Sequence, residues 1–244
     1  MSDFSLNGKK ILVTGASSGI GKQTAIMASR YSAELFITGR DPQRLEETYN
    51  LLTPGNHRMM TADLTDEAQM DRLIKELPAL NGIVHCAGIV GPLPAKFILR
   101  EHIDKMFSIN YIVPVNLTGK LLRAKKVSDH ASILFMSTIA TRNPYYGGAL
   151  YSGSKAALEA YAKTLALEQG PKGIRANYLM AGLVDTPMIV NPSEENMKEE
   201  ALDRYLKRYP MGIGDPKDVA STILFFLSDA SKWISGTSLI LGGE

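Results

Sequence analysis

The chain has 244 residues, of which 45% are hydrophobic and 21% charged, a balance typical of one globular domain. Its 27 basic and 25 acidic residues leave a net charge of only +2, which argues against binding to nucleic acid or to an anionic membrane. A single cysteine excludes an intrachain disulfide, and four scattered histidines lack the spacing of metal ligands, so we expect no metal.

Short apolar runs alternate with amphipathic segments along the chain. The apolar runs predict about seven strands, over residues 11–14, 34–38, 58–61, 82–86, 132–136, 174–179 and 238–241. Apolar residues at helical spacing from Met70 to Leu77 predict a helix, and another is expected over 218–227. This alternation predicts an α/β fold in one domain spanning residues 1–244, with a doubly wound parallel sheet covered by helices on both faces.

The amino-terminal residues are polar, and no apolar run reaches the roughly 18 residues that a membrane span needs. We therefore expect no signal peptide, no membrane association and a cytoplasmic location.

A glycine-rich segment follows the first predicted strand and opens a helix; it reads Thr14-Gly15-Ala16-Ser17-Ser18-Gly19-Ile20-Gly21. Gly15 permits a tight turn, while Gly19 and Gly21 let the backbone approach a phosphate and let the helix pack on the strand. Free N–H groups at the helix start favour a pyrophosphate. The segment predicts a Rossmann-type dinucleotide site, and a glycine-rich turn without a ligand is the alternative.

The end of the second predicted strand bears on cofactor choice. Gly39 stands where an NAD site places an acid for the ribose 2′-hydroxyl, and Arg40 can pair with a 2′-phosphate, which favours NADP(H) over NAD(H). Asp41 argues in the other direction, and in the alternative it simply begins the next helix. Asp63, followed by Leu64, is expected either to accept a hydrogen bond from the adenine amino group or to cap a helix.

Tyr151 and Lys155 lie four residues apart in a predicted helix, which puts them on one helix face. The lysine ammonium favours the phenolate and lowers the pKa of the tyrosine from about 10. The pair therefore predicts proton transfer to or from a carbonyl or alcohol oxygen, although the same spacing also occurs on helices without catalytic function.

One segment, residues 181–210, breaks the alternation and is rich in Pro, Glu and Met, with a candidate helix start at Asn191. Its position after a strand predicts a mobile substrate lid. Substrate selectivity is expected from this segment and from residues 141–150, and the alternative is that their large side chains only cover the core. These side chains are Tyr145, Tyr146, Met188, Met197 and Tyr205.

Taken together, these motifs resemble the short-chain dehydrogenase/reductase family, in the branch that includes 3-oxoacyl-carrier-protein reductases. The glycine-rich block matches the family pattern Thr-Gly-x-x-x-Gly-x-Gly, and the resemblance extends over essentially the whole chain. Further matches are Cys86-Ala87-Gly88, Asn110, the pair Tyr151 and Lys155, the segment 177–186 and the tail 234–243.

The resemblance implies a reversible hydride transfer between NADP(H) and a ketone or secondary alcohol. Tyr151 would act as general acid/base, Lys155 would lower its pKa and bind the nicotinamide ribose, and Asn110 would hold a proton-relaying water. Cofactor contacts are implied for Ala87, Gly88, Val184 and Thr186.

A hydroxyl at the end of the fifth strand should hold the substrate oxygen. Counting thirteen residues back from Tyr151 gives Thr138, which is the expected match; a loop one residue longer would assign the role to Ser137.

Two segments depart from the family pattern. His85-Cys86 replaces paired asparagines, which is expected to tune cofactor binding without abolishing it. Ala181-Gly182 replaces Pro-Gly after the sixth strand and predicts a more flexible turn. Cys86, on an apolar strand, is expected to be buried and inert.

The choice of partners stays open at this stage. A 3-oxoacyl-carrier-protein reductase would need basic residues at the mouth of the site, for which Lys125, Lys126 and Lys172 are candidates, unless they are ordinary solvated lysines. The family resemblance implies a homotetramer, with a dimer as the alternative, assembled through residues 100–124 and 148–170. Other possible functions are a non-catalytic NADP(H)-sensing protein and an epimerase or dehydratase, whose relatives carry a larger carboxyl-terminal domain.

Overall fold

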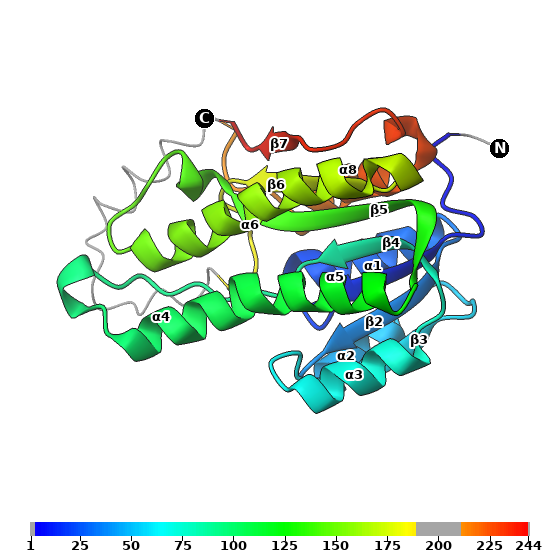
Figure 1. The fold of residues 1–244 in the computed structure, drawn as a ribbon, viewed down its shortest axis with the longest axis horizontal. Helices are drawn as coiled ribbons and strands as arrows, with labels where there is room; N and C mark the ends of the chain where they lie inside the picture. The colour runs from blue at the N-terminus through cyan, green and yellow to red at the C-terminus, as the bar shows by residue number, and fades with distance from the viewer. Residues whose placement is uncertain (1–2, 189–210, 244) are drawn as a thin grey trace.

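The computed structural model describes residues 3–188 and 211–243. Within them, seven strands form one sheet: β1 (Lys10–Thr14), β2 (Glu34–Gly39), β3 (Arg58–Thr61), β4 (Leu80–His85), β5 (Val127–Thr138), β6 (Arg175–Ala181) and β7 (Ser238–Leu241). All neighbouring strands are parallel, in the order β3-β2-β1-β4-β5-β6-β7 (Figure 1). The expected doubly wound Rossmann-type sheet is confirmed.

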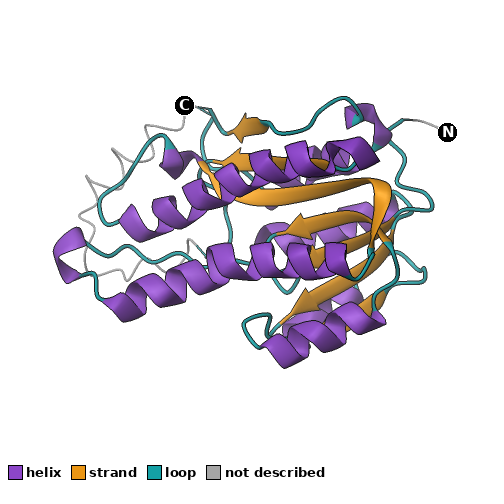
Figure 2. Cartoon of the chain, viewed as in Figure 1, coloured by secondary structure: helices purple, strands orange, loops and turns teal. Residues whose placement is uncertain are grey.

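Helices connect the strands (Figure 2). The longer ones are α1 (Gly19–Arg30), α2 (Pro42–Tyr49), α3 (Glu67–Glu76), α4 (Arg100–Phe107), α5 (Val113–Arg123), α6 (Ala149–Gln169) and α8 (Pro216–Leu227). Single 3₁₀ turns lie at Ala95–Phe97, Ile139–Thr141, Gly170–Lys172 and Asp229–Ser231, and a π-helical turn covers Ser108–Ile112. Within the described residues, no helix is both long and apolar enough to cross a bilayer.

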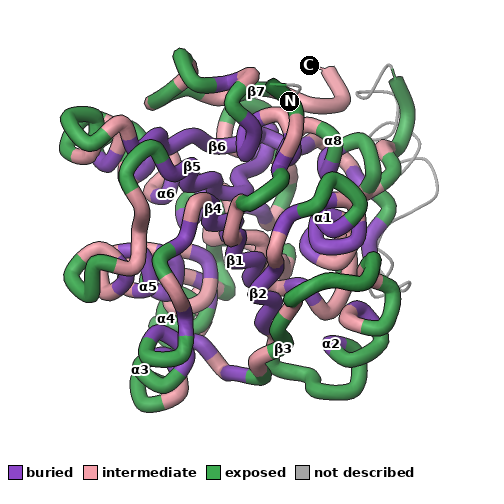
Figure 3. The backbone as a smooth tube through the Cα atoms, turned by 90° about the vertical axis from the view of Figure 1, so that its right-hand side faces the viewer, coloured by how far each residue is buried: buried purple, intermediate pink, exposed green. Residues whose placement is uncertain are grey.

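The sheet separates two apolar cores (Figure 3). On one face, α1, α2 and α8 pack against side chains such as Val13 and Leu134. On the other face, α3, α5 and α6 pack against the alternate strand residues, such as Ile83 and Phe135. Because successive strand residues point to opposite faces and both faces are covered, the central strands read as continuous apolar runs.

Several element boundaries differ from the prediction. β4 ends at His85, so Cys86 lies in the loop after it, and β5 extends over Val127–Thr138 and not only over 132–136. Residues 100–124, expected to pair subunits, form α4 and α5 with the π-helical turn between them, in which Asn110 bonds to the distant loop at Ile89. Residues 189–210 of the predicted lid, with the candidate helix start at Asn191, lie outside the described residues.

The topology determines where a ligand can bind. The chain runs outward from β1 through β2 to β3, then returns to β4 on the other side of β1. In open parallel sheets, this reversal leaves a crevice at the carboxyl ends of the two central strands. The loops after β1 and β4 meet there.

Candidate active site

The glycine-rich turn after β1 is packed too closely for larger residues. Gly15 has a φ of +65°, and a Cβ on it would lie 2.7 Å from the Ala87 nitrogen. A Cβ on Gly21 would lie 2.3 Å from the Gly15 carbonyl oxygen. These distances show that the turn presses on the loop after β4 and that the first turn of α1 presses on the glycine-rich turn.

The amino-terminal end of α1 is open toward this crevice. Its N-cap, Ser18, has an extended backbone and makes no side-chain capping bond, and the first turn of α1 holds no acidic residue. The starts of α2, α3 and α8, by contrast, are each capped by an aspartate side chain. An uncapped helix start with its positive dipole end directed at a crevice suits an anionic group such as a pyrophosphate.

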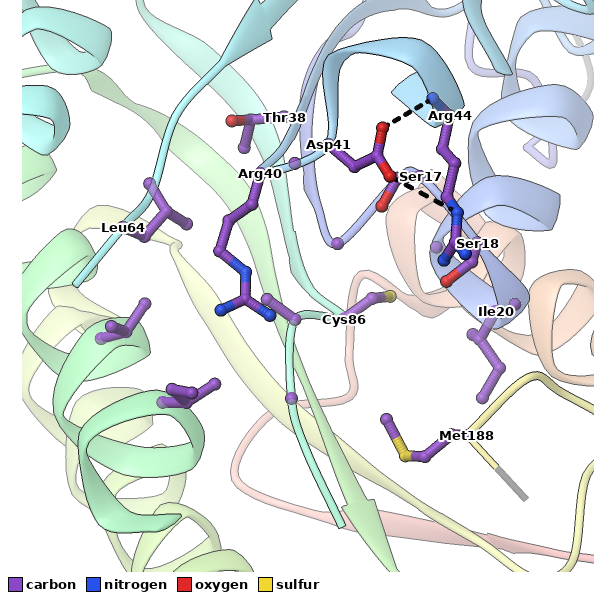
Figure 4. A pocket seen from close by; sticks show the side chains of 18 of the residues that line it. Ser17, Ser18, Ile20, Thr38, Arg40, Asp41, Arg44, Leu64, Cys86 and Met188 are labelled. Carbon is purple, nitrogen blue, oxygen red and sulfur yellow. Dashed lines mark hydrogen bonds and ion pairs between the residues drawn. The ribbon is translucent and has the colours of Figure 1, made fainter. Parts of the chain in front are cut away.

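A cavity of about 680 Å³ extends along the carboxyl edge of the sheet (Figure 4). It is lined by many of the residues predicted from sequence, namely Gly15, Ser17, Ser18, Gly19, Ile20, Gly21, Arg40, Asp63, Leu64, Ala87, Gly88 and Thr186. Three residues predicted to contact the cofactor do not line this cavity: Val184, Tyr151 and Lys155. Val184 is instead buried in the core beside α8.

Sequence reasoning missed several lining residues, among them Arg44, Ile109 and Val113. Ile109 and Val113 come from the π-helical turn and the start of α5, four residues apart. Their spacing of four residues predicts that both lie on the same face of a helix. Nothing in the sequence indicated that this face borders the cavity.

Two arginines border the cavity at the end of β2. Arg40 extends into it, whereas Asp41 turns toward Arg44 (Figure 4). Asp41 caps α2 by accepting from the Arg44 backbone nitrogen at 3.1 Å, and its other carboxylate oxygen lies 3.5 Å from Arg44 Nε. The Asp41 carboxylate, which argued against a 2′-phosphate site, is therefore bound to the start of α2 and to the Arg44 guanidinium.

At the end of β3, Asp63 accepts hydrogen bonds from the Thr65 backbone nitrogen at 2.9 Å and from Thr65 Oγ1 at 2.7 Å. The Thr65 hydroxyl bond is the main cause that lowers the pKa of Asp63, so the group is a carboxylate at neutral pH. The expectation that Asp63 caps a helix is wrong: Asp66 is the N-cap of α3 and accepts from Gln69.

Asn110 is fully buried in the π-helical turn and links three segments. Its Oδ1 accepts from the Ile89 nitrogen at 2.8 Å, and its Nδ2 donates to the Ile89 carbonyl at 3.0 Å and to Ser154 Oγ at 3.1 Å. π-helical turns occur mostly as local insertions and are frequent at functional sites. Here the turn brings the asparagine against both the β4 loop and α6.

Lys155 is 5% exposed and donates from Nζ to the Met136 carbonyl at 2.8 Å. Burial lowers its pKa from 10.5 to about 8, which still leaves it mainly protonated at neutral pH. Its Nζ lies 5.9 Å from the centre of the Tyr151 ring, in the range of a cation–π contact.

Gly88 connects this pair to the cavity. A Cβ on Gly88 would lie 3.2 Å from Asn110 Oδ1 and 3.4 Å from Lys155 Nζ. Gly88 itself lines the cavity, so Asn110 and Lys155 lie directly behind the cavity wall at Gly88, and the Tyr151 ring lies next to Lys155. A buried cation next to a phenol is an arrangement suited to proton transfer.

The two hydroxyl candidates at the end of β5 have different partners. Ser137 Oγ donates to Glu159 Oε1 on α6 at 2.5 Å. Thr138 Oγ1 accepts from the Ala140 nitrogen at 3.2 Å. Adjacent strand residues point to opposite faces, which explains why the two hydroxyls separate.

At the first departure from the family pattern, His85 is buried and Cys86 is half-buried and lines the cavity, and neither holds a charge near neutral pH. His85 stacks on Phe135 with ring centres 4.8 Å apart, and its Nε2 is 2.9 Å from Thr118 Oγ1. Burial lowers the pKa of His85 to about 3 and raises the pKa of the Cys86 thiol to about 12. The raised pKa keeps the thiol protonated at neutral pH, which argues against a redox role. The expectation that Cys86 is buried on a strand is wrong, because it is half-buried in the loop after β4.

The expectation that Lys125, Lys126 and Lys172 lie at the mouth of the site is wrong. They immediately precede β5 and β6, so they lie at the amino edge of the parallel sheet, opposite the cavity. Lys126 instead donates to the Leu77 carbonyl at the end of α3.

Two loops beyond the cavity are joined to each other. The Leu93 nitrogen donates to the Gly147 carbonyl at 2.8 Å, and Gly147 has a φ of +80°. Tyr146 beside it is 84% exposed and Met188 is 41% exposed, which leaves apolar surface next to the site. Met197 and Tyr205, also expected to contact substrate, lie outside the described residues.

Comparison with known proteins gives a consistent result. The family model described as "Enoyl-(Acyl carrier protein) reductase" matches residues 15–243. The chain is 30% identical to glucose 1-dehydrogenase of Gluconobacter oxydans, over 97% of this chain and 91% of that protein. It is 28% identical to 3-oxoacyl-(acyl-carrier-protein) reductase FabG of Rickettsia felis, over 98% of this chain and 97% of that protein.

Solved structures agree with these relatives. A structure described as a short chain dehydrogenase/reductase family protein has a TM-score of 0.85 and 28% identity, covering 98% of both chains. A dehydrogenase/reductase from Sinorhizobium meliloti 1021 has a TM-score of 0.87 and 28% identity, covering 99% of this chain and 96% of that one.

Proposed function

The chain belongs to the short-chain dehydrogenase/reductase family of oxidoreductases that act on alcohols and ketones, and from this premise we propose that it transfers hydride between NADP(H) and a ketone or secondary alcohol. The observation that carries the proposal is the grouping of Asn110, Lys155 and Tyr151 behind Gly88, which lines a cavity large enough for a dinucleotide.

The residues present fit a nicotinamide dinucleotide. The uncapped start of α1 and the glycine-rich turn would hold the pyrophosphate, and Asp63 with Leu64 would border the adenine. At the other end, Lys155 and Tyr151 would contact the nicotinamide ribose, with Thr186 near the carboxamide. When bound, the nicotinamide supplies or accepts the hydride, while the protein orients substrate and handles the proton.

The preference for NADP(H) rests on charge at the end of β2. Gly39 offers no carboxylate to a ribose 2′-hydroxyl, Arg40 extends into the cavity, and Arg44 also lines the cavity, near Ser18. Two guanidinium groups suit a phosphate, because each can donate charge-assisted hydrogen bonds. Asp41 does not oppose this assignment, since it is paired with Arg44 and caps α2.

In the reductive direction, we assign to Tyr151 the transfer of a proton from its hydroxyl to the substrate carbonyl oxygen. The protonated Lys155 favours the phenolate that remains, because an adjacent positive charge stabilises the negative form. Asn110 joins the β4 loop to α6 through its hydrogen bonds to Ile89 and Ser154, and it would support proton relay toward Lys155. A positioned proton donor contributes about 10²–10⁴ in rate.

We assign the substrate-oxygen contact to Thr138. Its Oγ1 accepts from the Ala140 nitrogen, which leaves the hydroxyl hydrogen free to donate. The Ser137 hydroxyl is already donated to Glu159.

Two observations bear on the substrate class. The relative FabG is named as a 3-oxoacyl-carrier-protein reductase, and a β-keto thioester is a ketone, so this substrate is a specific candidate. Since Lys125, Lys126 and Lys172 lie at the opposite edge of the sheet, they give no support for a carrier protein at the mouth. We therefore favour a small free ketone over a carrier-protein-bound thioester as the substrate.

The test is to measure NADPH and NADH oxidation side by side over a panel of ketones that includes 3-oxoacyl thioesters. Turnover with NADPH exceeding turnover with NADH supports the proposal and identifies the substrate class. Tight NADPH binding without turnover in either direction would favour a non-catalytic sensor.

A further inference from the structure

Glu159 is an acidic residue on α6 whose carboxylate is turned inward. It is half-buried, and its Oε1 accepts from Ser137 Oγ at 2.5 Å and from Thr141 Oγ1 at 2.9 Å. Hydrogen bonds from hydroxyls to a carboxylate are charge-assisted and stronger than neutral ones. One carboxylate oxygen thus accepts hydrogen bonds from the hydroxyls of two residues, one at the end of β5 and one in the turn that follows it.

These two hydroxyls flank Thr138. Ser137 precedes it, and Thr141 closes the 3₁₀ turn that follows it. The Thr141 hydroxyl also lies 3.1 Å from the Thr138 carbonyl. Glu159 therefore holds the chain on both sides of Thr138 but does not touch the Thr138 hydroxyl.

The same helix face carries the proton-transfer pair. Tyr151, Lys155 and Glu159 follow one another at intervals of four residues on α6. Lys155 holds the end of β5 at the Met136 carbonyl, and Glu159 holds it at Ser137. One rigid helix thus fixes the proton donor and the strand end that bears the partner hydroxyl.

We propose that Glu159 is a positioning residue that fixes the Thr138 hydroxyl relative to Tyr151 through its hydrogen bonds to Ser137 and Thr141. This inference rests on the proposed function, in which Thr138 and Tyr151 act on the same substrate oxygen. Displacement of a reacting group by about 1 Å can cost on the order of 10²-fold in rate, so loss of these bonds is expected to affect turnover more than substrate affinity.

The test compares Glu159→Leu with Glu159→Gln, whose amide oxygen can still accept from both hydroxyls. Glu168→Leu is the matched control, because Glu168 is an exposed acid on the same helix. For Glu159→Leu we expect kcat to fall by about 10- to 50-fold while KM and the cofactor Kd stay within about threefold. Glu159→Gln should recover most of the lost kcat, and Glu168→Leu should match the wild type.

Backbone exchange provides a readout that does not depend on turnover. Hydrogen–deuterium exchange over residues 137–143 should be about tenfold faster in Glu159→Leu and close to wild type in the Gln and Glu168 variants. Should Glu159→Leu not fold, the pair Ser137→Ala and Thr141→Val removes the same bonds without placing an apolar group at 159.

The outcomes separate two questions. Unchanged exchange over residues 137–143 in Glu159→Leu would overturn the positioning role. So would a kcat of Glu159→Leu equal to that of the wild type, provided that the wild type turns over a substrate. A kcat loss that Glu159→Gln does not reduce would also overturn it. If the wild type turns over no substrate, the reductase proposal fails, while the exchange measurement still decides whether Glu159 orders the segment.

Discussion

The two ends of the cavity differ in the kind of groups that form them and in how far these groups are exposed to water. The proposed nucleotide end consists of backbone, glycines such as Gly21 and exposed charged side chains such as Arg40. The proposed catalytic end, behind Gly88, rests on buried side chains, with Asn110 at 0% and Lys155 at 5% exposure. Charges at the first end are screened by water, whereas those at the second act in a low dielectric. Substitutions at the catalytic end should therefore change chemistry and stability together, and those at the nucleotide end should change mainly binding.

The largest expected effect is that of Lys155→Met, which removes the buried cation. Turnover should fall by about 10²–10⁴, because Tyr151 loses the charge that favours its phenolate. Stability should move in the opposite direction. The lowering of the Lys155 pKa from 10.5 to about 8 sets the burial cost at no more than about 3 kcal/mol. We expect the variant to gain about 1–3 kcal/mol in unfolding free energy at pH 7.

The pH dependence of this gain follows from the direction of the shift. Below pH 8, Lys155 is protonated in both folded and unfolded states, and the burial cost is fully present. Between pH 8 and 10.5, the folded protein releases the proton first, so the wild type regains stability. Urea unfolding at pH 7 and pH 10 should therefore show a smaller difference between variant and wild type at the higher pH. A variant less stable than the wild type at pH 7 would contradict this account.

Gly21→Ala tests the backbone-built end. The new Cβ would lie 2.3 Å from the Gly15 carbonyl oxygen. Because both groups belong to the backbone, the clash can be relieved only by a shift of the backbone. We expect a loss of about 1–3 kcal/mol in stability and at least tenfold weaker cofactor binding, measured by thermal unfolding and calorimetry. Gly91→Ala is the control, since nothing lies within 4 Å of its Cβ position. Equal behaviour of the two variants would show that the turn is not tightly packed.

Thr138→Val removes a hydroxyl and keeps the shape of the side chain. Turnover should fall by about 10- to 100-fold, whereas Thr138→Ser should stay within about threefold of the wild type. Steady-state kinetics on both variants checks this. Full activity in Thr138→Val would return the assignment to Ser137 and would weaken the inference about Glu159.

Arg40→Ala should have the smallest effect on catalysis and a selective effect on binding. Loss of charge-assisted hydrogen bonds to a 2′-phosphate is expected to weaken NADPH by about 10- to 100-fold and NADH by less than about twofold. Arg123→Ala, an exposed arginine at the end of α5, is the control. Equal losses for the two cofactors in Arg40→Ala would show that Arg40 does not contact the 2′-phosphate.

Most of the fold could be predicted from sequence, because it follows from local patterns. Apolar runs predicted the seven strands, and strand–helix alternation predicted the parallel sheet. The π-helical turn at Ser108–Ile112 could not be predicted, since it depends on hydrogen bonds between Asn110 and the distant Ile89. The length of β5 was underestimated because its first residues are polar and partly exposed.

The two ends of the site also differed in predictability. The glycine-rich motif identified much of the nucleotide end, since the motif itself makes the turn. At the proposed catalytic end, the four-residue spacing of Tyr151 and Lys155 predicted the pair from sequence. The hydrogen bond from Ser137 to Glu159 joins residues 22 positions apart, so no local pattern predicted it. The placement of Lys125, Lys126 and Lys172 was misjudged, although their position before parallel strands already implied the amino edge.

The central claim is that Tyr151 transfers the proton at a nicotinamide site, and Tyr151→Phe tests it most directly. Both kcat for ketone reduction and the Kd for NADPH should be measured for this variant and for the wild type. We predict that kcat falls by at least about 10²-fold while Kd stays within about twofold. Full turnover in Tyr151→Phe would contradict the proton-transfer role and with it the proposed mechanism.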